Sequence, residues 1–146
     1  MRFAAKALIA TLTLTAGIAL AKEGVQDPTV KIRMDLMGTV GQNTKILGDM
    51  AGDKAPFDAA AAEAAKTALA AAAAQIPAVF ETEADDPVSE ARPEIWMNTE
   101  GFVEKAKGLE TAAGAIDVSS LASLQAGMGA IAGACKACHS DFRAKK

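Results

Sequence analysis

The strongest constraint on the fold is a row of apolar residues that runs through residues 121–142 at helical spacing. The row consists of Leu121, Leu124, Met128, Ile131, Cys135, Cys138 and Phe142. Its members recur at alternating intervals of three and four, which places them on one face of a helix. The buried face of this helix therefore carries both cysteines of the chain.

The same stretch contains the sequence Cys135-Lys136-Ala137-Cys138-His139, which uses both cysteines and the one histidine of the chain. The spacing C-x-x-C-H is typical of covalent attachment of a c-type haem. On a helix these three side chains crowd one face, so two thioethers can hold the porphyrin edge while the imidazole binds the iron. We therefore interpret Cys135 and Cys138 as haem-attachment residues and His139 as the proximal iron ligand.

Three other kinds of site use the same residue types. A redox dithiol needs C-x-x-C at the start of a helix after a strand, whereas this pair lies late in a helical pattern. A structural zinc site usually needs four ligands, and the sequence has no further Cys or His. A disulfide between residues three apart on a helix has poor geometry. Haem attachment is the favoured interpretation.

The N-terminal residues have the composition of a secretory signal. Arg2 and Lys6 precede an uncharged apolar run that ends in small residues of the kind signal peptidase prefers. The run of about 14 residues is short for a membrane anchor, which needs roughly 20. We expect export to the periplasm and cleavage after Ala21, so that residues 1–21 are the signal peptide and residues 22–146 the domain that carries the haem.

The remaining chain is long enough for one domain with one core. Its 18 acidic residues outnumber its 13 basic ones, since Arg2 and Lys6 of the full chain's 15 lie in the signal, and this balance argues against nucleic acid as a partner. With no Tyr and one Trp, the core must be built mostly from Ala, Leu, Ile, Val and Met. A large prosthetic group would supply the apolar bulk that these side chains lack.

Three further stretches predict helices. One covers residues 28–48, with Asp27 as its N-cap and a proline at its first position. The residues 56–76 form another, because they are rich in alanine, the best helix former, and Pro77 is expected to end it. Residues 98–115 have the pattern of an ordinary amphipathic helix.

The expected packing faces differ between these helices. Two apolar rows in residues 28–48 predict a helix that is buried on more than one side. The rows are Val30, Met34, Met37, Gly41 and Thr44, and Ile32, Leu36, Val40 and Leu47. In residues 56–76, small side chains allow close approach of another helix. These side chains include Ala61, Ala64, Ala68 and Ala72. Gly127, Gly129 and Gly133 suggest a similarly close approach of a backbone or of the porphyrin to the last helix.

Residues 77–93 have the composition of a long solvated loop. Its acidic residues are Glu81, Glu83, Asp85, Asp86 and Glu90. We interpret them as a wet surface, with a specific docking role as the alternative. Trp96, which follows this loop, is expected to pack in the core or against the cofactor.

Four helices, two short connections, one longer connection and no period-two alternation predict an all-α fold. The arrangement expected is an antiparallel four-helix bundle with haem bound near one end.

The whole pattern resembles the cytochrome c prime family, the class II c-type cytochromes. The late C-x-x-C-H motif followed by Phe142 and Arg143 carries most of this resemblance. The segment 93–96 and the spacing of Arg33 four residues before Met37 are also similar to that family. The resemblance covers essentially the whole chain beyond the signal.

The resemblance implies roles for individual residues. Arg33 would approach a haem propionate, and Arg143 would lie near His139. Phe142 would pack beside the haem. Met37 matches the position that overlies the distal iron face, where low-spin members use a methionine as the sixth ligand and five-coordinate members leave the iron without one.

Met34 is a departure from the family, in which the residue after the first-helix arginine is often polar. It brings a second thioether to the same helix, so Met37, Met34 or neither could be the sixth ligand. This choice separates two functions. A closed six-coordinate iron suits electron transfer, whereas an open site suits binding of nitric oxide or carbon monoxide.

We expect transfer of single electrons through one covalently attached haem, with gas binding as the alternative. The sequence contains no catalytic constellation, so we do not expect an enzyme. Redox proteins are the expected partners. The resemblance also implies a homodimer built from the first two helices.

Overall fold

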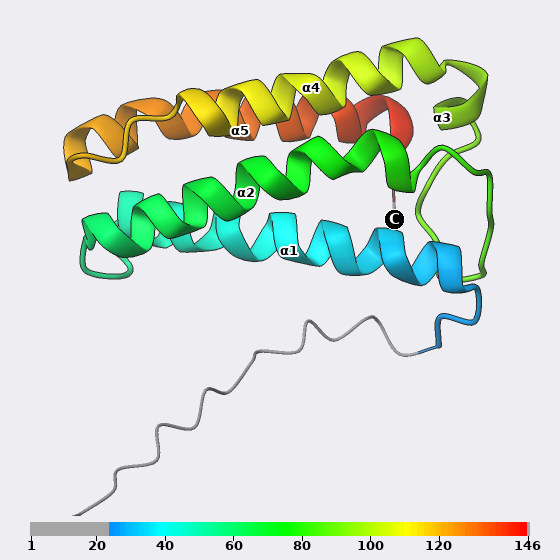
Figure 1. Ribbon diagram of the computed structural model, residues 1–146, viewed down its shortest axis with the longest axis horizontal. Helices are drawn as coiled ribbons and strands as arrows, with labels where there is room; N and C mark the ends of the chain where they lie inside the picture. Colours follow the sequence, from blue (N-terminus) through cyan, green and yellow to red (C-terminus); the bar gives the residue numbers. More distant parts are fainter. Residues whose placement is uncertain (1–23, 146) are drawn as a thin grey trace, which may run out of the picture.

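The computed structural model describes residues 24–145, and these fold into a bundle of helices (Figure 1). The helices are α1 (Pro28–Ala51), α2 (Ala59–Val79), α3 (Glu94–Met97), α4 (Thr99–Ala115) and α5 (Leu121–Phe142). The four long helices alternate in direction, and α1 packs on α2, α2 on α4, α4 on α5 and α5 on α1. The prediction of an all-α, antiparallel four-helix bundle is confirmed. The predicted signal peptide, residues 1–21, lies outside the described residues.

Side-chain caps determine where the helices begin. Asp27 accepts hydrogen bonds from the main-chain N–H groups of Thr29 and Val30, as its predicted role as N-cap of α1 requires. Asp58 caps α2 in the same way, and Ser120 forms a capping box at the start of α5. None of the described helices is long and apolar enough to cross a membrane.

The predicted end of α2 at Pro77 is wrong, because the helix continues to Val79. A proline inside a helix removes one N–H donor. Here the next turn still closes, since the N–H of Phe80 donates to the carbonyl of Ile76 at 3.2 Å. The extra turn carries the chain to the end of the bundle where the candidate site lies.

The predicted packing side chains of α2 are only partly correct, because Ala72 is buried and Ala68 half-buried. Ala61 and Ala64 are exposed, and the buried residues follow a neighbouring row. This row is Ala62, Ala65, Leu69, Ala72, Ala73 and Ile76. Methyl groups surround this helix on nearly every side, so composition could not select which row of alanines faces the core.

Helix α1 is buried along one stripe and not on several sides. Ile32 is 57% exposed and Gly41 is exposed, whereas Val30, Val40 and Leu47 are buried. Among the three α5 glycines, only Gly127 has a close protein neighbour, and this neighbour is a side chain and not the predicted backbone; approach of the porphyrin stays a prediction. A Cβ built at Gly127 would lie 2.5 Å from Cγ1 of Ile116, while Gly129 and Gly133 face open space.

The α2–α3 connection (residues 80–93) crosses the end of the bundle and returns the chain from α2 to α4 (Figure 1). Its buried residue Asp86 accepts hydrogen bonds from the main-chain N–H groups of Gln26 at 2.7 Å, Asp27 at 3.0 Å and Val88 at 3.0 Å. The carboxylate therefore fixes the connection to the start of α1. Asp86 is not part of a wet acidic surface, contrary to our interpretation of the sequence.

The other half of the connection is fixed to the end of α5. The N–H of Ala144 donates to the carbonyl of Glu90 at 2.8 Å, and the N–H of Arg92 donates to the carbonyl of Phe142 at 3.0 Å. An isolated antiparallel β-bridge forms at this point. One loop thus joins the beginning of the first helix to the end of the last.

Candidate haem site

A cavity of about 580 Å³ opens between the helices at the end of the bundle that the α2–α3 connection crosses. This volume lies within the range of cofactor pockets, about 300–1,000 Å³. Its wall combines residues 30–44 of α1, the end of α2, residues 88–91 of the α2–α3 connection, residues 102–109 of α4 and the last part of α5. Most of the wall is apolar, so water would be displaced by a large flat cofactor at little cost.

The α5 wall carries all three residues of the predicted haem motif. Cys135, Cys138 and His139 line the cavity together, and neither cysteine takes part in a disulfide. Burial raises the pKa of both thiols, which keeps them protonated. Burial and then the nearby Arg143 lower the pKa of His139, against an opposing effect of Glu90. The imidazole is therefore neutral near pH 7, the form that binds metals.

The α1 wall brings both candidate thioethers to the same cavity. Met34 and Met37 lie three residues apart, on adjacent positions of one helix face, and both are half-buried lining residues. Val40 continues this wall one turn further along α1. The geometry thus retains both methionines as candidates for the sixth iron ligand.

Arg33 also lines the cavity, but its guanidinium already has protein partners. Nε donates to the carbonyl of Val79 at 3.0 Å, Nη1 donates to that of Ala84 at 3.0 Å, and Nη2 donates to that of Thr82. The residue is only 3% exposed, and burial lowers its pKa. These bonds hold the end of α2 and the following turn in place. Contact between Arg33 and a haem propionate stays a prediction.

Trp96 supports Arg33 and does not line the cavity. Its Nε1 donates to the carbonyl of Phe80 at 2.8 Å. The rings of Trp96 and Phe80 each lie 5.1 Å from Cζ of Arg33, within the range of cation–π attraction. Of the two roles expected for Trp96, the geometry favours core packing over direct contact with the cofactor.

Phe142 is buried and lines the cavity, as the sequence predicts for a residue beside the haem. Its ring packs edge-on against Phe102, with 5.3 Å between centroids, and Phe102 packs in turn against Phe80. This aromatic row joins α5, α4 and the end of α2. The end of α5 that carries the motif is thus packed against α4 and the end of α2 through aromatic rings.

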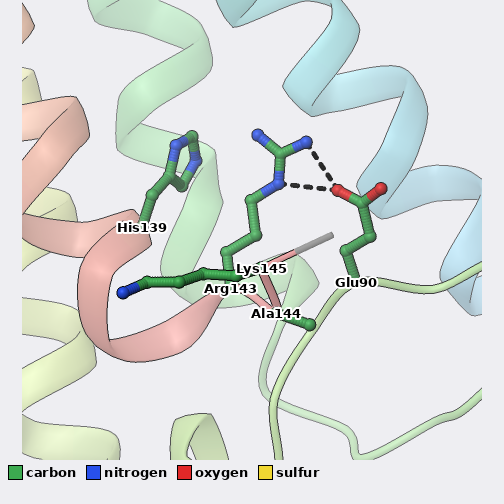
Figure 2. Close-up of a pocket in the computed structure, with 5 residues that line it drawn as sticks. All are labelled: Glu90, His139, Arg143, Ala144 and Lys145. Carbon is green, nitrogen blue, oxygen red and sulfur yellow. Dashed lines mark hydrogen bonds and ion pairs between the residues drawn. The ribbon is translucent and has the colours of Figure 1, made fainter.

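Arg143 lies beside His139, as the family resemblance implies, and it forms an ion pair with Glu90 (Figure 2). A smaller cavity of about 240 Å³ lies among these three residues, Ala144 and Lys145. Sequence reasoning missed Glu90 as a site residue. Its partner is 53 positions away, and no local pattern connects a loop carboxylate to the end of another helix.

Lys105 is a second residue that the sequence did not assign to the site. Its Nζ donates to the carbonyl of Ala137 at 2.9 Å and pairs with Asp141, which ties α4 to the turn that carries the motif. In an amphipathic helix, charged side chains are expected on the face away from the core. The aliphatic stem of Lys105 nevertheless lines the cavity, because long lysine side chains can bury their methylenes while the charge reaches a polar partner.

The residues present fit a covalently attached haem. Two unpaired thiols and a neutral imidazole share one helix face, and this face opens on an apolar cavity of suitable size. An all-α bundle with this site defines a c-type haem protein. Residues 28–143 match the family described as Cytochrome C', so the chain belongs to the cytochrome c' family, whose members carry covalently attached haem c.

Individual relatives extend over nearly the whole chain. Cytochrome c-554 of Cereibacter sphaeroides is 36% identical, and the match covers 95% of this chain and 96% of that protein. The solved structure of cytochrome c' from Rhodopseudomonas palustris is 31% identical with a TM-score of 0.71, covering 83% of this chain and 99% of the other.

A third relative was solved with a gas bound. It is a ferrous variant of cytochrome c prime from Alcaligenes xylosoxidans with bound NO, 29% identical, with a TM-score of 0.67. The match covers 81% of this chain and 94% of that one. The chain therefore belongs to a family of haem proteins that transfer electrons or bind gases.

Proposed function

We propose that this chain is a periplasmic carrier of single electrons. In this proposal Cys135 and Cys138 hold the haem, His139 is the proximal ligand and Met37 is the sixth ligand. The observation that carries the proposal is the presence of thioether side chains on the α1 wall of the cavity that His139 enters from α5. A soft, neutral thioether opposite an imidazole favours ferrous iron and closes the site to added ligands.

The residues of the chain would each perform a simple task. When bound, haem supplies reversible one-electron chemistry. The two cysteines fix its edge to α5, and burial keeps His139 neutral so that a ring nitrogen is free to ligate. Val40, Phe102 and Leu109 exclude water from the cavity. Such a site changes little between two oxidation states, which supports rapid electron exchange and needs no catalytic group.

Binding of a small gas is the second candidate function. The relative from Alcaligenes xylosoxidans that was solved with bound NO supports it. A gas binder needs an iron with one vacant position, which requires that neither Met34 nor Met37 ligates. The apolar α1 wall would then act as a protected pocket for a diatomic ligand.

Substitution of Met37 decides between the two functions. We expect a low-spin spectrum from the wild-type holoprotein, and a high-spin spectrum with rapid carbon monoxide binding from Met37→Ala. Met34→Ala is the matched control, since it removes the neighbouring thioether, and it should remain low-spin. Absorption spectra and stopped-flow mixing with carbon monoxide measure both properties.

Other results would lead to a different assignment of the sixth iron ligand. A wild type that is already high-spin and binds carbon monoxide quickly contradicts Met37 ligation and favours gas binding. Conversion to high spin by Met34→Ala alone would assign the sixth ligand to Met34.

We also propose export with cleavage after Ala21, which N-terminal sequencing tests, and a homodimer through α1 and α2, which analytical ultracentrifugation tests.

A further inference from the structure

We propose that Glu90 is a positioning residue for the proximal side of the haem: it fixes Arg143 beside His139 and offsets the charge of that arginine. The inference rests on the proposed function only in requiring a haem ligated by His139. Glu90 lies in a connection that the sequence suggested was merely solvated. Its carboxylate would thereby act on the reduction potential without touching the iron.

Direct contacts join Glu90 to Arg143. The Nε of Arg143 donates to Oε2 of Glu90 at 2.7 Å, and Nη2 lies 2.5 Å from the same oxygen. Figure 2 shows the guanidinium between the carboxylate and the imidazole of His139, with all three side chains around one small cavity. Two donors on one oxygen restrict the arginine far more than a single contact would.

The main chain delivers the two side chains to each other. Ala91 and Arg143 form an antiparallel bridge, and the N–H of Ala144 donates to the carbonyl of Glu90 at 2.8 Å. These bonds involve no side-chain atoms. Replacing Glu90 with Gln would therefore remove the negative charge while the loop stays paired with the end of α5 and the amide oxygen still accepts from Arg143.

The pair places opposite charges near the haem ligand. Arg143 brings a positive charge and Glu90 a negative charge to the small cavity that His139 also lines. A nearby cation favours the reduced form of a redox centre and a nearby anion favours the oxidised form. The side chains are 52% and 21% exposed, so solvent weakens both effects without cancelling them.

The test compares reduction potentials of holoprotein variants by spectroelectrochemistry. We expect E90Q to favour reduction about threefold, about 28 mV at 59 mV per tenfold change. R143Q should oppose reduction by a similar factor, and E90Q/R143Q should return near the wild-type value. E94Q is the matched control, because Glu94 also pairs with an arginine, Arg92, but lines neither cavity.

Several outcomes would overturn the proposal. They are a shift in E90Q no larger than in E94Q, or shifts of the same sign in E90Q and R143Q. A purely structural loop contact would lower the unfolding midpoint of E90Q without these opposite potentials, so denaturation is measured on the same samples.

Two further comparisons keep the result decisive. If E90Q does not accumulate as holoprotein, the arginine variants decide. R143Q must then lower the reduction potential. R143K keeps the positive charge, so its reduction potential must differ from that of the wild type by no more than that of E94Q does. Equal shifts of R143Q and R143K contradict the proposal. Failure of the wild type to carry covalent haem would contradict the proposed function itself, whereas haem with unchanged potentials contradicts only the role of Glu90.

Discussion

The α1 and α5 walls of the cavity each contribute an arginine, and the two are held by different chemistry. Arg33 of α1 is buried, donates to three main-chain carbonyls and lies against two aromatic rings. Arg143 at the end of α5 is half exposed and pairs with the carboxylate of Glu90. A buried cation needs a complete set of acceptors, whereas an exposed one keeps its hydration. Arg33 therefore serves the fold, and Arg143 is suited to adjusting charge.

One loop supplies partners to both walls. The α2–α3 connection provides the carbonyls of Thr82 and Ala84 to Arg33, the carboxylate of Asp86 to the start of α1 and that of Glu90 to Arg143. A single segment thus forms hydrogen bonds with both the thioether wall and the end of the haem-attachment wall. Substitutions on the two walls should therefore have effects of different size, and the effect should be larger where the replaced side chain is more deeply buried.

Removal of the two thiols should have the largest effect, because it takes from the α5 wall the groups that attach the haem. We expect Cys135→Ala with Cys138→Ala to yield no covalent haem and little folded protein, because the cavity of about 580 Å³ loses its filler. Acid-acetone extraction, intact mass and circular dichroism measure this. Lys136→Ala, an exposed change inside the same motif, is the control and should retain haem.

The result has two separable parts. A wild-type protein that is colourless and has the mass of a bare polypeptide would refute haem attachment. A well-folded double variant without haem would not contradict haem attachment in the wild type. It would refute the claim that the core needs the cofactor in order to fold.

Replacing the two arginines in turn tests the comparison directly. Arg33→Met should lower the free energy of unfolding by about 3 kcal/mol, since buried carbonyl groups lose their donor. Arg143→Met should change it by less than about 1 kcal/mol, the usual range for an exposed ion pair. Urea denaturation of both holoproteins gives the two values. Equal losses would mean that burial does not distinguish the walls.

The smallest effect is expected at Asp86, and it should disappear in acid. Hydrogen bonds from main-chain N–H groups, first that of Asp27, lower the pKa of Asp86 below its usual value. Its contribution to stability is complete above the unfolded-state pKa, about 4, and is lost as the pH falls through the lower folded-state pKa. Thermal unfolding of the wild type and Asp86→Asn should therefore converge as the pH falls below about 4.

A neighbouring carboxylate provides the control for this pH dependence. Asp85 is exposed, so Asp85→Asn should follow the wild type across the same pH range. Curves for the wild type and Asp86→Asn that stay parallel into acid would show that the bonds of Asp86 do not stabilise the start of α1.

Local patterns were sufficient to predict the four long helices and the residues of the motif, but they did not predict the short helix α3. The predicted helix over residues 98–115 matches α4 within one residue, because Asn98 is an N-cap and its apolar residues follow one stripe. Predictions of the buried face of a helix failed where several rows of its side chains are chemically alike. The alanines of α2 and the exposed Ile32 of α1 are examples, since only the positions of neighbouring helices decide which row is buried.

The site was predictable to the extent that its groups share one helix. Cys135, Cys138 and His139 meet because of their spacing alone. The partners of Arg33 and Arg143 lie some 50 residues away in sequence, in a connection that has no periodicity to read. Sequence alone could not assign Glu90, because an acidic loop residue becomes an ion-pair partner only after the bundle has closed.

Trp96 offers an optical signal for the end of the bundle that these contacts hold together. It is the one tryptophan of the chain, and its indole is fixed to the carbonyl of Phe80 and stacked beside Arg33. Haem absorbs in the region where indole emits, so an attached haem quenches the fluorescence of a nearby tryptophan. We therefore expect the fluorescence of the holoprotein to be quenched while this end is closed and to rise when it opens. The fluorescence of this single residue would therefore report opening of the haem end, whereas circular dichroism would report unfolding of the remaining helices.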